Sequence, residues 1–154
     1  IIILFPRNAR RRPLNKLRAF SMKASIRGRI DLALPATVTS FELIGDRTPF
    51  MRTDVMTLEI RGPFVGRRGD QSLWDEIEPE ALASLLKGFE GQDLLAVESD
   101  PGWLHLDFTD GWIRVVAATT YRSWESWVMT LPKITWRGGM DGKGPDKDWK
   151  VDGK

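Results

Sequence analysis

The side chains with the greatest potential for chemistry lie in the second half of the chain. His105 is the single histidine, and Asp107 follows it two positions later, on the same face if the segment is a strand. An imidazole beside a carboxylate is the pairing that general acid–base catalysis uses. Glu125, between two tryptophans, adds a second carboxylate. One hypothesis is therefore a small hydrolase-type enzyme that uses Asp107, Glu125 and His105.

Most of the apparatus that such an enzyme needs is missing from the sequence. The chain contains no cysteine, and no serine lies in a Gly-x-Ser-x-Gly turn, which excludes thiol nucleophiles and the serine elbow. With one histidine and no cysteine, zinc sites built from these ligands are excluded as well. Asp141, Asp146 and Asp148 lack the alternating spacing and the terminal glutamate of a calcium loop. We therefore expect no catalytic residue, no metal and no cofactor.

Each candidate also has a structural explanation. Asp107 is expected to lie across a hairpin from Arg114, and His105 is explained as a histidine on the surface of a strand. Glu125 has three structural roles open to it, namely a salt bridge to Arg114, a salt bridge to Arg122, or a cap on a backbone group. The main prediction is therefore a protein that is not an enzyme.

The strongest structural signal is Asp110-Gly111 between two alternating runs. Asp-Gly is typical of a two-residue hairpin turn, and this register sets Asp107 directly opposite Arg114. Most of the leucine, isoleucine and phenylalanine side chains of the two runs then share one apolar face. The other face carries Trp103, His105, Asp107, Arg114 and Val116.

Alternation of apolar and polar residues predicts three further strands, near residues 38–44, 56–60 and 124–131. The stretch 62–72 is rich in glycine and is not followed directly by a helical pattern. It also lacks the Gly-Lys-Ser/Thr ending of a phosphate-binding loop. We interpret it as a connection between strands.

One helix is predicted over residues 79–89. Its apolar stripe consists of Leu82, Leu85, Leu86 and Phe89, and Pro79 suits the first turn. A helix this short needs a sheet against which to pack that stripe. The expected fold is therefore α+β, a mostly antiparallel sheet of about five to seven strands with one packed helix.

Charge divides the chain into three parts. Residues 1–30 carry nine basic side chains and no acidic one, whereas residues 31–132 carry eight basic and seventeen acidic, a net of −9. Residues 133–154 have a net charge of +2. An acidic body of this kind attracts basic proteins and repels nucleic acid.

The same divisions predict the domain organisation. Residues 1–22 are expected to be a basic leader, disordered or non-native, with Met22 as a natural start; the alternative is an arm that binds nucleic acid or anionic lipid. Residues 23–135 are expected to form one globular domain, and 136–154 a flexible tail rich in Gly, Lys and Asp. Because no apolar run approaches the roughly 18 residues of a membrane span, we expect a cytoplasmic protein.

Several short motifs follow one another over about residues 55–131. They are Glu78-Pro79 before the Leu-rich helix, Gly91-Gln-Asp-Leu94, Gly102-Trp-Leu-His-Leu-Asp-Phe-Thr-Asp-Gly111 and Trp124-Glu-Ser-Trp-Val-Met129. This order resembles an uncharacterised family of small, largely actinobacterial domains, which has an F-x-[DN]-G hairpin followed by an aromatic-E-[AS]-W motif. The layout is similar to that of immunity proteins, and the family carries no established activity. The basic leader and the residues after Pro132 depart from its pattern.

Tryptophan is unusually frequent, with seven residues in the chain. Trp127 shares its strand face with Met129 and is expected in the core, whereas Trp124 alternates away from it. Trp124 would then join Trp103 or Trp112 on the outer face of the sheet. Exposed aromatics beside charges are typical of binding surfaces, although a helix or a loop could equally cover this face.

The main functional prediction is a non-catalytic protein-binding domain, of which an immunity-like protein that neutralises a basic toxin is one form. The predicted partner-binding residues are Trp103, His105, Trp112, Trp124 and Glu125. The alternatives are the enzyme described above and nucleic-acid binding through the basic N-terminal arm, which the acidic body would oppose. The sequence does not determine the oligomeric state.

Overall fold

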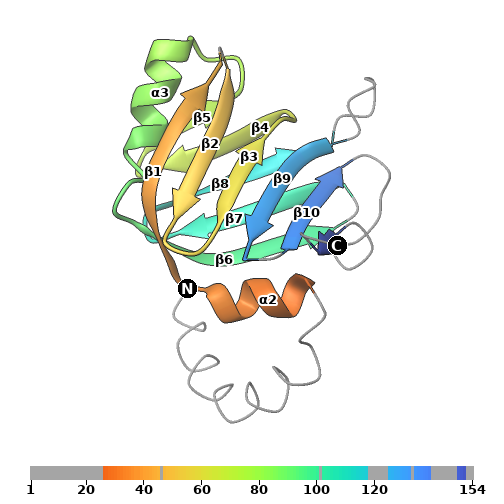
Figure 1. Ribbon diagram of the computed structural model, residues 1–154. Helices are drawn as coiled ribbons and strands as arrows, with labels where there is room; N and C mark the ends of the chain where they lie inside the picture. Colours follow the sequence, from red (N-terminus) through yellow and green to blue (C-terminus); the bar gives the residue numbers. More distant parts are fainter. Residues whose placement is uncertain are drawn as a thin grey trace.

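The computed structural model describes residues 26–45, 47–100, 102–117, 125–132, 134–139 and 149–151 (Figure 1). The helices of this part are α2 (Ile26–Ala33) and α3 (Pro79–Lys87). The first strands are β1 (Ala36–Ile44), β2 (Thr48–Thr53), β3 (Thr57–Ile60), β4 (Phe64–Arg68) and β5 (Gln71–Trp74). After α3 follow β6 (Asp93–Asp100), β7 (Trp103–Phe108), β8 (Gly111–Val116), β9 (Glu125–Leu131), β10 (Ile134–Gly139) and β11 (Trp149–Val151).

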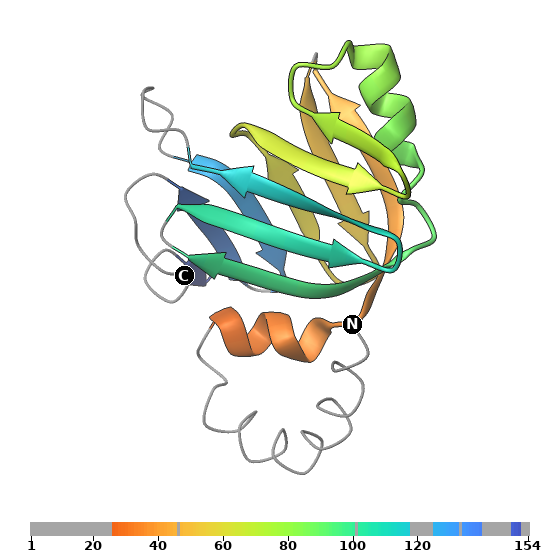
Figure 2. The same ribbon diagram turned by 180° about the vertical axis from the view of Figure 1, so that it is seen from behind.

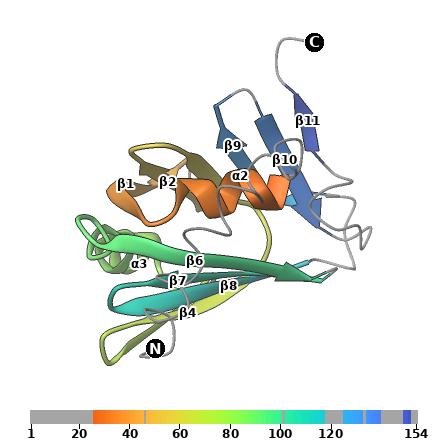
Figure 3. The ribbon, with the colours of Figure 1, turned by 90° about the horizontal axis from the view of Figure 1, so that it is seen from below.

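The strands pair in the order β11-β10-β9-β3-β2-β1-β6-β7-β8-β4-β5, and every pairing is antiparallel. β3 and β4 are far apart in this order but are joined directly by a short segment of chain, so the two regions of the sheet are brought together. β1, β2, β3 with β4, β8, β7 and β6 form a closed circuit, with β9 to β11 attached beyond β3 and β5 beyond β4. Figure 3 shows the circuit flattened into two layers, with β1 and β2 in one layer and β6, β7, β8 and β4 in the other.

Two bends carry the chain between the layers. At the first, β1 pairs with β6 through its first two residues and with β2 beyond them. At the second, between β3 and β4, Gly62 N donates to Ser126 O (2.9 Å) and Val116 N donates to Pro63 O (2.8 Å). A side chain at Gly62 would overlap Ser126 and the Val116 carbonyl oxygen, so this bend requires glycine.

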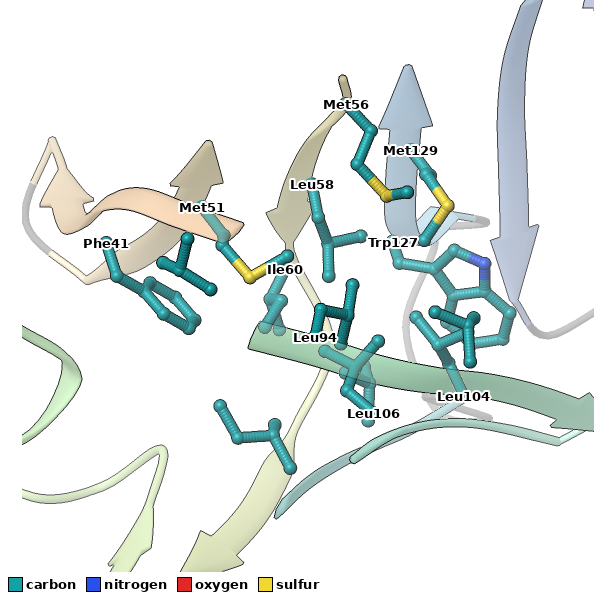
Figure 4. Close-up of a cluster of buried hydrophobic side chains, with 14 of the residues drawn as sticks. Phe41, Met51, Met56, Leu58, Ile60, Leu94, Leu104, Leu106, Trp127 and Met129 are labelled. Atoms are coloured by element: carbon teal, nitrogen blue, oxygen red, sulfur yellow. The ribbon is translucent and has the colours of Figure 1, made fainter. Parts of the chain in front are cut away.

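The hydrophobic core fills the space between the two layers (Figure 4). Its central side chains are each 3% exposed or less: Phe41, Met51, Met56, Leu58, Ile60, Leu94, Leu104 and Leu106. Trp127 and Met129 extend this cluster toward β9. Burying each such side chain contributes about 1.5–3 kcal/mol, so the circuit is held together mainly by its own interior.

The two helices lie at opposite ends of the strands. Helix α3 packs on β1 and β5 and buries Leu82 and Leu86 completely. The Phe89 ring, just past the helix, lies 4.5 Å from the Phe108 ring and 5.9 Å from the Phe41 ring, measured between centroids. Helix α2 lies across the other end of the two layers (Figures 1 and 3) and buries Ile30. The predicted helix near residues 79–89 and its apolar stripe are therefore confirmed.

The α+β class and the antiparallel sheet are confirmed, but the expected numbers of elements are too low. The sheet has eleven strands where about five to seven were expected, and the described residues contain two helices where one was expected. Part of the difference lies in residues 62–72. Their interpretation as a connection is wrong, because they contain β4 and the start of β5, a hairpin that turns at Gly69 with φ +61°.

The ends of the chain can be compared with the expected domain boundaries only in part. The expected C-terminal boundary at residue 135 falls inside β10, where the Trp136 side chain is 1% exposed. The basic leader, residues 1–22, lies outside the described residues. No helix in the described part of the chain is both long and apolar enough to cross a membrane.

Candidate partner-binding face

The hairpin of β7 and β8 turns one residue earlier than predicted. Phe108 pairs with Gly111, so Thr109 and Asp110 form the turn, and Asp107 pairs with Trp112 instead of Arg114. The reason lies at Gly111, which has φ +135° and begins β8. A side chain there would overlap the Arg67 carbonyl oxygen, so the glycine belongs in the strand that passes β4.

The corrected register leaves the two faces of the hairpin as predicted. Each residue of β7 pairs with a β8 residue two positions away from the predicted one. Because side chains in a strand alternate between the two faces, a shift of two positions leaves every residue on its predicted face. Leu104, Leu106, Ile113 and Val115 are completely buried, and Phe108 is 4% exposed. The predicted opposition of Asp107 and Arg114 is wrong, since His105 is the residue that pairs with Arg114.

The outward side of β6, β7, β8, β4 and β5 forms one continuous surface, which we call the outer face (Figure 2). One row of cross-strand partners runs through Glu98, His105, Arg114, Val65 and Trp74. A second row runs through Asp100, Trp103 and Val116, and a third through Asp107, Trp112 and Arg67. Neither helix crosses the outer face in Figure 2.

The middle of the outer face is an interlocked cluster of five side chains. His105 Nε2 lies 3.1 Å from Asp107 Oδ1, and Arg114 Nε donates to His105 Nδ1 over 3.2 Å. The imidazole stacks on Trp112 with 5.5 Å between centroids and 24° between planes. The Arg114 guanidinium lies over Trp103, with Cζ 4.5 Å from the ring centroid.

These contacts assign the tautomer of the imidazole. An arginine Nε can only donate, so His105 Nδ1 must be the acceptor and carries no proton. His105 Nε2 then carries the proton and donates it to the Asp107 carboxylate. Both ring nitrogens are therefore engaged in hydrogen bonds. In this arrangement the imidazole has no lone pair free to act as a general base.

The surroundings of the cluster are exposed and partly apolar. The His105 side chain is 16% exposed and that of Asp107 is 43% exposed. Around them Val65 and Trp74 are each 46% exposed and Val116 is 43% exposed, which places three large exposed hydrophobic residues on this one face. Half-buried aromatics beside exposed apolar and charged groups are the composition of a recognition surface.

The structure brings three of the five predicted partner-binding residues together: Trp103, His105 and Trp112. Trp124 lies outside the described residues. Glu125 begins β9, which belongs to the other part of the sheet, and its side chain is not among those described. The described residues contain no group of three or more His, Cys, Asp or Glu side chains that could hold a metal ion.

The sequence reasoning missed Val65 and Trp74 as members of this face. Both lie in the hairpin of β4 and β5, where Phe64, Gly66 and Leu73 point inward and are buried. The sequence does contain a hairpin signal here, because the turn residues Gly69-Asp70 separate two short runs in which apolar and polar residues alternate. With Gly66 and Arg68 at inward positions of β4, this alternation of apolar and polar residues is weak.

No family model, curated protein or solved structure matches this chain. The family resemblance of the hairpin and the aromatic-E-[AS]-W motif therefore stays a prediction.

Proposed function

We propose that this protein is a non-catalytic binding module that docks another protein on its outer face. The observation that carries the proposal is the interlocked cluster of Trp103, His105 and Arg114 in the middle of a sheet face that neither described helix covers. Interface hot spots are enriched in tryptophan and arginine that are already fixed in place, because little side-chain entropy is lost on binding.

The chemistry of the surrounding residues favours a partner that is basic overall. Residues 31–132 have a net charge of −9, and Glu98, Asp100 and Asp107 lie along the β6 and β7 side of the outer face. Charge of this sign speeds the encounter with a positively charged protein. An immunity-like protein that neutralises a basic toxin, such as a nuclease with a positive substrate groove, is one form of this function.

A pair of matched variants tests the docking face. Val65→Lys places a charge in the middle of the outer face, and Val55→Lys places the same charge in the turn between β2 and β3, where the exposure of Val55 is 37%. Both variants change the net charge equally. The partner is first isolated from the source organism with the full chain as bait, and its affinity for each variant is then measured.

We expect Val65→Lys to weaken binding by at least about tenfold and Val55→Lys to leave it unchanged. The association rate should also fall steeply with salt concentration. Equal effects of the two variants would show that the outer face is not the docking surface. Isolation of no protein, or of a neutral small molecule bound near His105, would contradict a protein-binding function.

A further inference from the structure

Arg114 differs from the other arginine of the outer face in having no oxygen acceptor among the residues that the structure describes, since Arg67 Nε donates to Gly69 O over 3.2 Å. Its Nε donates to His105, and its guanidinium plane lies over Trp103. Among the described residues, no carboxylate or carbonyl oxygen accepts from its two terminal nitrogens, Nη1 and Nη2. The guanidinium is thus fixed in direction, while no described oxygen accepts from the edge that carries those donors.

Other arginines of the same acidic body have found oxygen acceptors. Arg52 pairs with Glu42 at 3.2 Å, and Arg61 pairs with Glu59 at 2.7 Å. Arg47 donates to backbone carbonyl oxygens of Asp75 and Ile77. Arg114 differs because the groups that hold it are an imidazole nitrogen and an indole face. Neither of these groups carries a negative charge that would neutralise the guanidinium.

We propose that Arg114 is a carboxylate-binding residue, and that the docked partner places the side chain of an aspartate or glutamate against Nη1 and Nη2. This inference rests on the proposed function, since covering the outer face removes water from both terminal donors. A buried guanidinium without an acceptor is strongly unfavourable, so the partner must supply one. A carboxylate matches the planar pair of donors with two parallel hydrogen bonds.

His105 and Asp107 act on this site as positioning residues. The Asp107 carboxylate fixes the imidazole, and His105 Nδ1 in turn fixes the orientation of Arg114 Nε. Glu98 is the β6 partner of His105, and Asp100 is the β6 partner of Trp103. These acidic neighbours repel a generally acidic surface. The site therefore selects a single carboxylate within a basic surface, which agrees with a partner that is basic overall.

Peptide probes test the inference without the partner. The full chain, labelled with ¹⁵N, is titrated with a peptide that has one glutamate between alanines and both ends blocked. The control peptide has glutamine in place of glutamate. A third peptide has alanines only and a free terminal carboxylate, which separates a side-chain source from a chain end. Binding is followed through the Nε–Hε resonance of Arg114.

We expect the glutamate peptide to shift the Arg114 resonance in a saturable way and the glutamine peptide to leave it in place. Arg114→Lys, which keeps the charge but loses the planar pair of donors, should weaken binding of the glutamate peptide at least about tenfold, read from backbone resonances of β8. Arg67→Lys, on the same face opposite Trp112, should bind as the unchanged chain does. The inference would be overturned by any of three results: equal shifts of the Arg114 resonance with the glutamate and glutamine peptides, equal losses of affinity in Arg114→Lys and Arg67→Lys, or tighter binding of the peptide with the free terminal carboxylate.

Variants of His105 test the positioning role. His105→Phe removes the acceptor for Arg114 Nε, whereas His105→Gln keeps a side-chain oxygen that can accept from it. We expect the phenylalanine variant to bind the glutamate peptide several-fold more weakly and the glutamine variant to recover part of the loss. Similar losses in both folded variants would show that His105 does not position Arg114.

The two proposals fail in different ways. If the glutamate peptide does not bind while Val65→Lys still blocks the partner, docking on the outer face stands and the role of Arg114 is wrong. If the peptide binds but Val65→Lys has no effect on the partner, the carboxylate site stands alone and docking on this face is wrong.

Discussion

Two pairs of tryptophans in this protein have opposite surroundings. Trp103 and Trp112 lie on the outer face, where each contacts a polar ring or a cation, Arg114 in one case and His105 in the other. Trp127 and Trp136, on β9 and β10, are 2% and 1% exposed and meet edge to face, with 5.7 Å between centroids and 77° between planes. The same residue type therefore lies half-buried beside charged or polar groups in one region and is packed in the core in the other.

The difference in burial between the two pairs indicates what each contributes to the protein. The indole nitrogens of Trp127 and Trp136 have no acceptor among the described residues, so these side chains stabilise the fold through apolar area alone and carry a polar cost. Trp103 and Trp112 keep part of their surface in water and fix charged neighbours. We therefore expect the inner pair to control the stability of the fold and the outer pair to control binding.

The largest expected effect separates the two pairs directly. Trp127→Ala should lower the free energy of unfolding by about 3–5 kcal/mol, because it leaves a large cavity beside Leu104 and Met129. Trp103→Ala should lower it by about 1 kcal/mol or less, since its neighbours remain solvated. Urea denaturation of the full chain measures both. Equal losses would mean that the outer face is part of the core.

The next largest expected effect is a loss of stability on substitution of a glycine that packs against the inner pair, Trp127 and Trp136. The Trp127 indole lies flat against Gly138, the residue opposite it on β10, and a methyl group there would overlap three atoms of the indole. Gly138→Ala should therefore destabilise the fold by about 1–3 kcal/mol. Gly102→Ala is the matched control, because no described atom lies within 4 Å of its new methyl group. A loss in the control as large as that in Gly138→Ala would contradict this packing.

The faces of the strands could be predicted from the sequence, whereas the register and some elements could not. Alternation placed Trp127 in the core and Trp103 outside. Both assignments depend only on the rule that residues two positions apart in a strand lie on the same face. The register depended on where Gly111 sits relative to β4 and Phe89, a contact between segments more than twenty positions apart in the chain. No local turn preference contains that information.

The same limit applies to the pattern of buried residues in β1 and to the surroundings of Arg114. In β1 a bulge between Val38 and Ser40 shifts the pattern, so that Val38 and Phe41 are both buried although their positions differ by an odd number. Arg114 was placed opposite Asp107, as an ordinary charge pair. With the register moved by two, His105 lies between the two charges, and no described oxygen accepts from the terminal nitrogens of the guanidinium.

A smaller effect tests the cation–π contact that fixes Arg114. A double-mutant cycle with Trp103→Ala and Arg114→Met should give a coupling of about 0.5–1 kcal/mol in the free energy of unfolding. The reference is Arg52, which lies 4.6 Å from the Phe50 ring centroid and also pairs with Glu42. Phenylalanine has the weaker ring face, and the Arg52 side chain is 49% exposed, so that coupling should be smaller. A larger coupling energy for Phe50 and Arg52 than for Trp103 and Arg114 would show that Trp103 does not hold the Arg114 guanidinium.

The smallest effect is spectroscopic and concerns the proton on His105. The ¹⁵N-detected correlations of the imidazole should show the proton on Nε2 and none on Nδ1, because Nδ1 accepts from Arg114 Nε. Glu98 on β6 pairs with His105, and Trp112 on β8 stacks on the imidazole. The Arg114 Nε resonance should shift in His105→Phe, which removes the acceptor, and shift less in His105→Gln, whose side-chain oxygen can accept from it. A proton found on Nδ1 would contradict the assigned tautomer, and with it the way in which His105 holds Arg114.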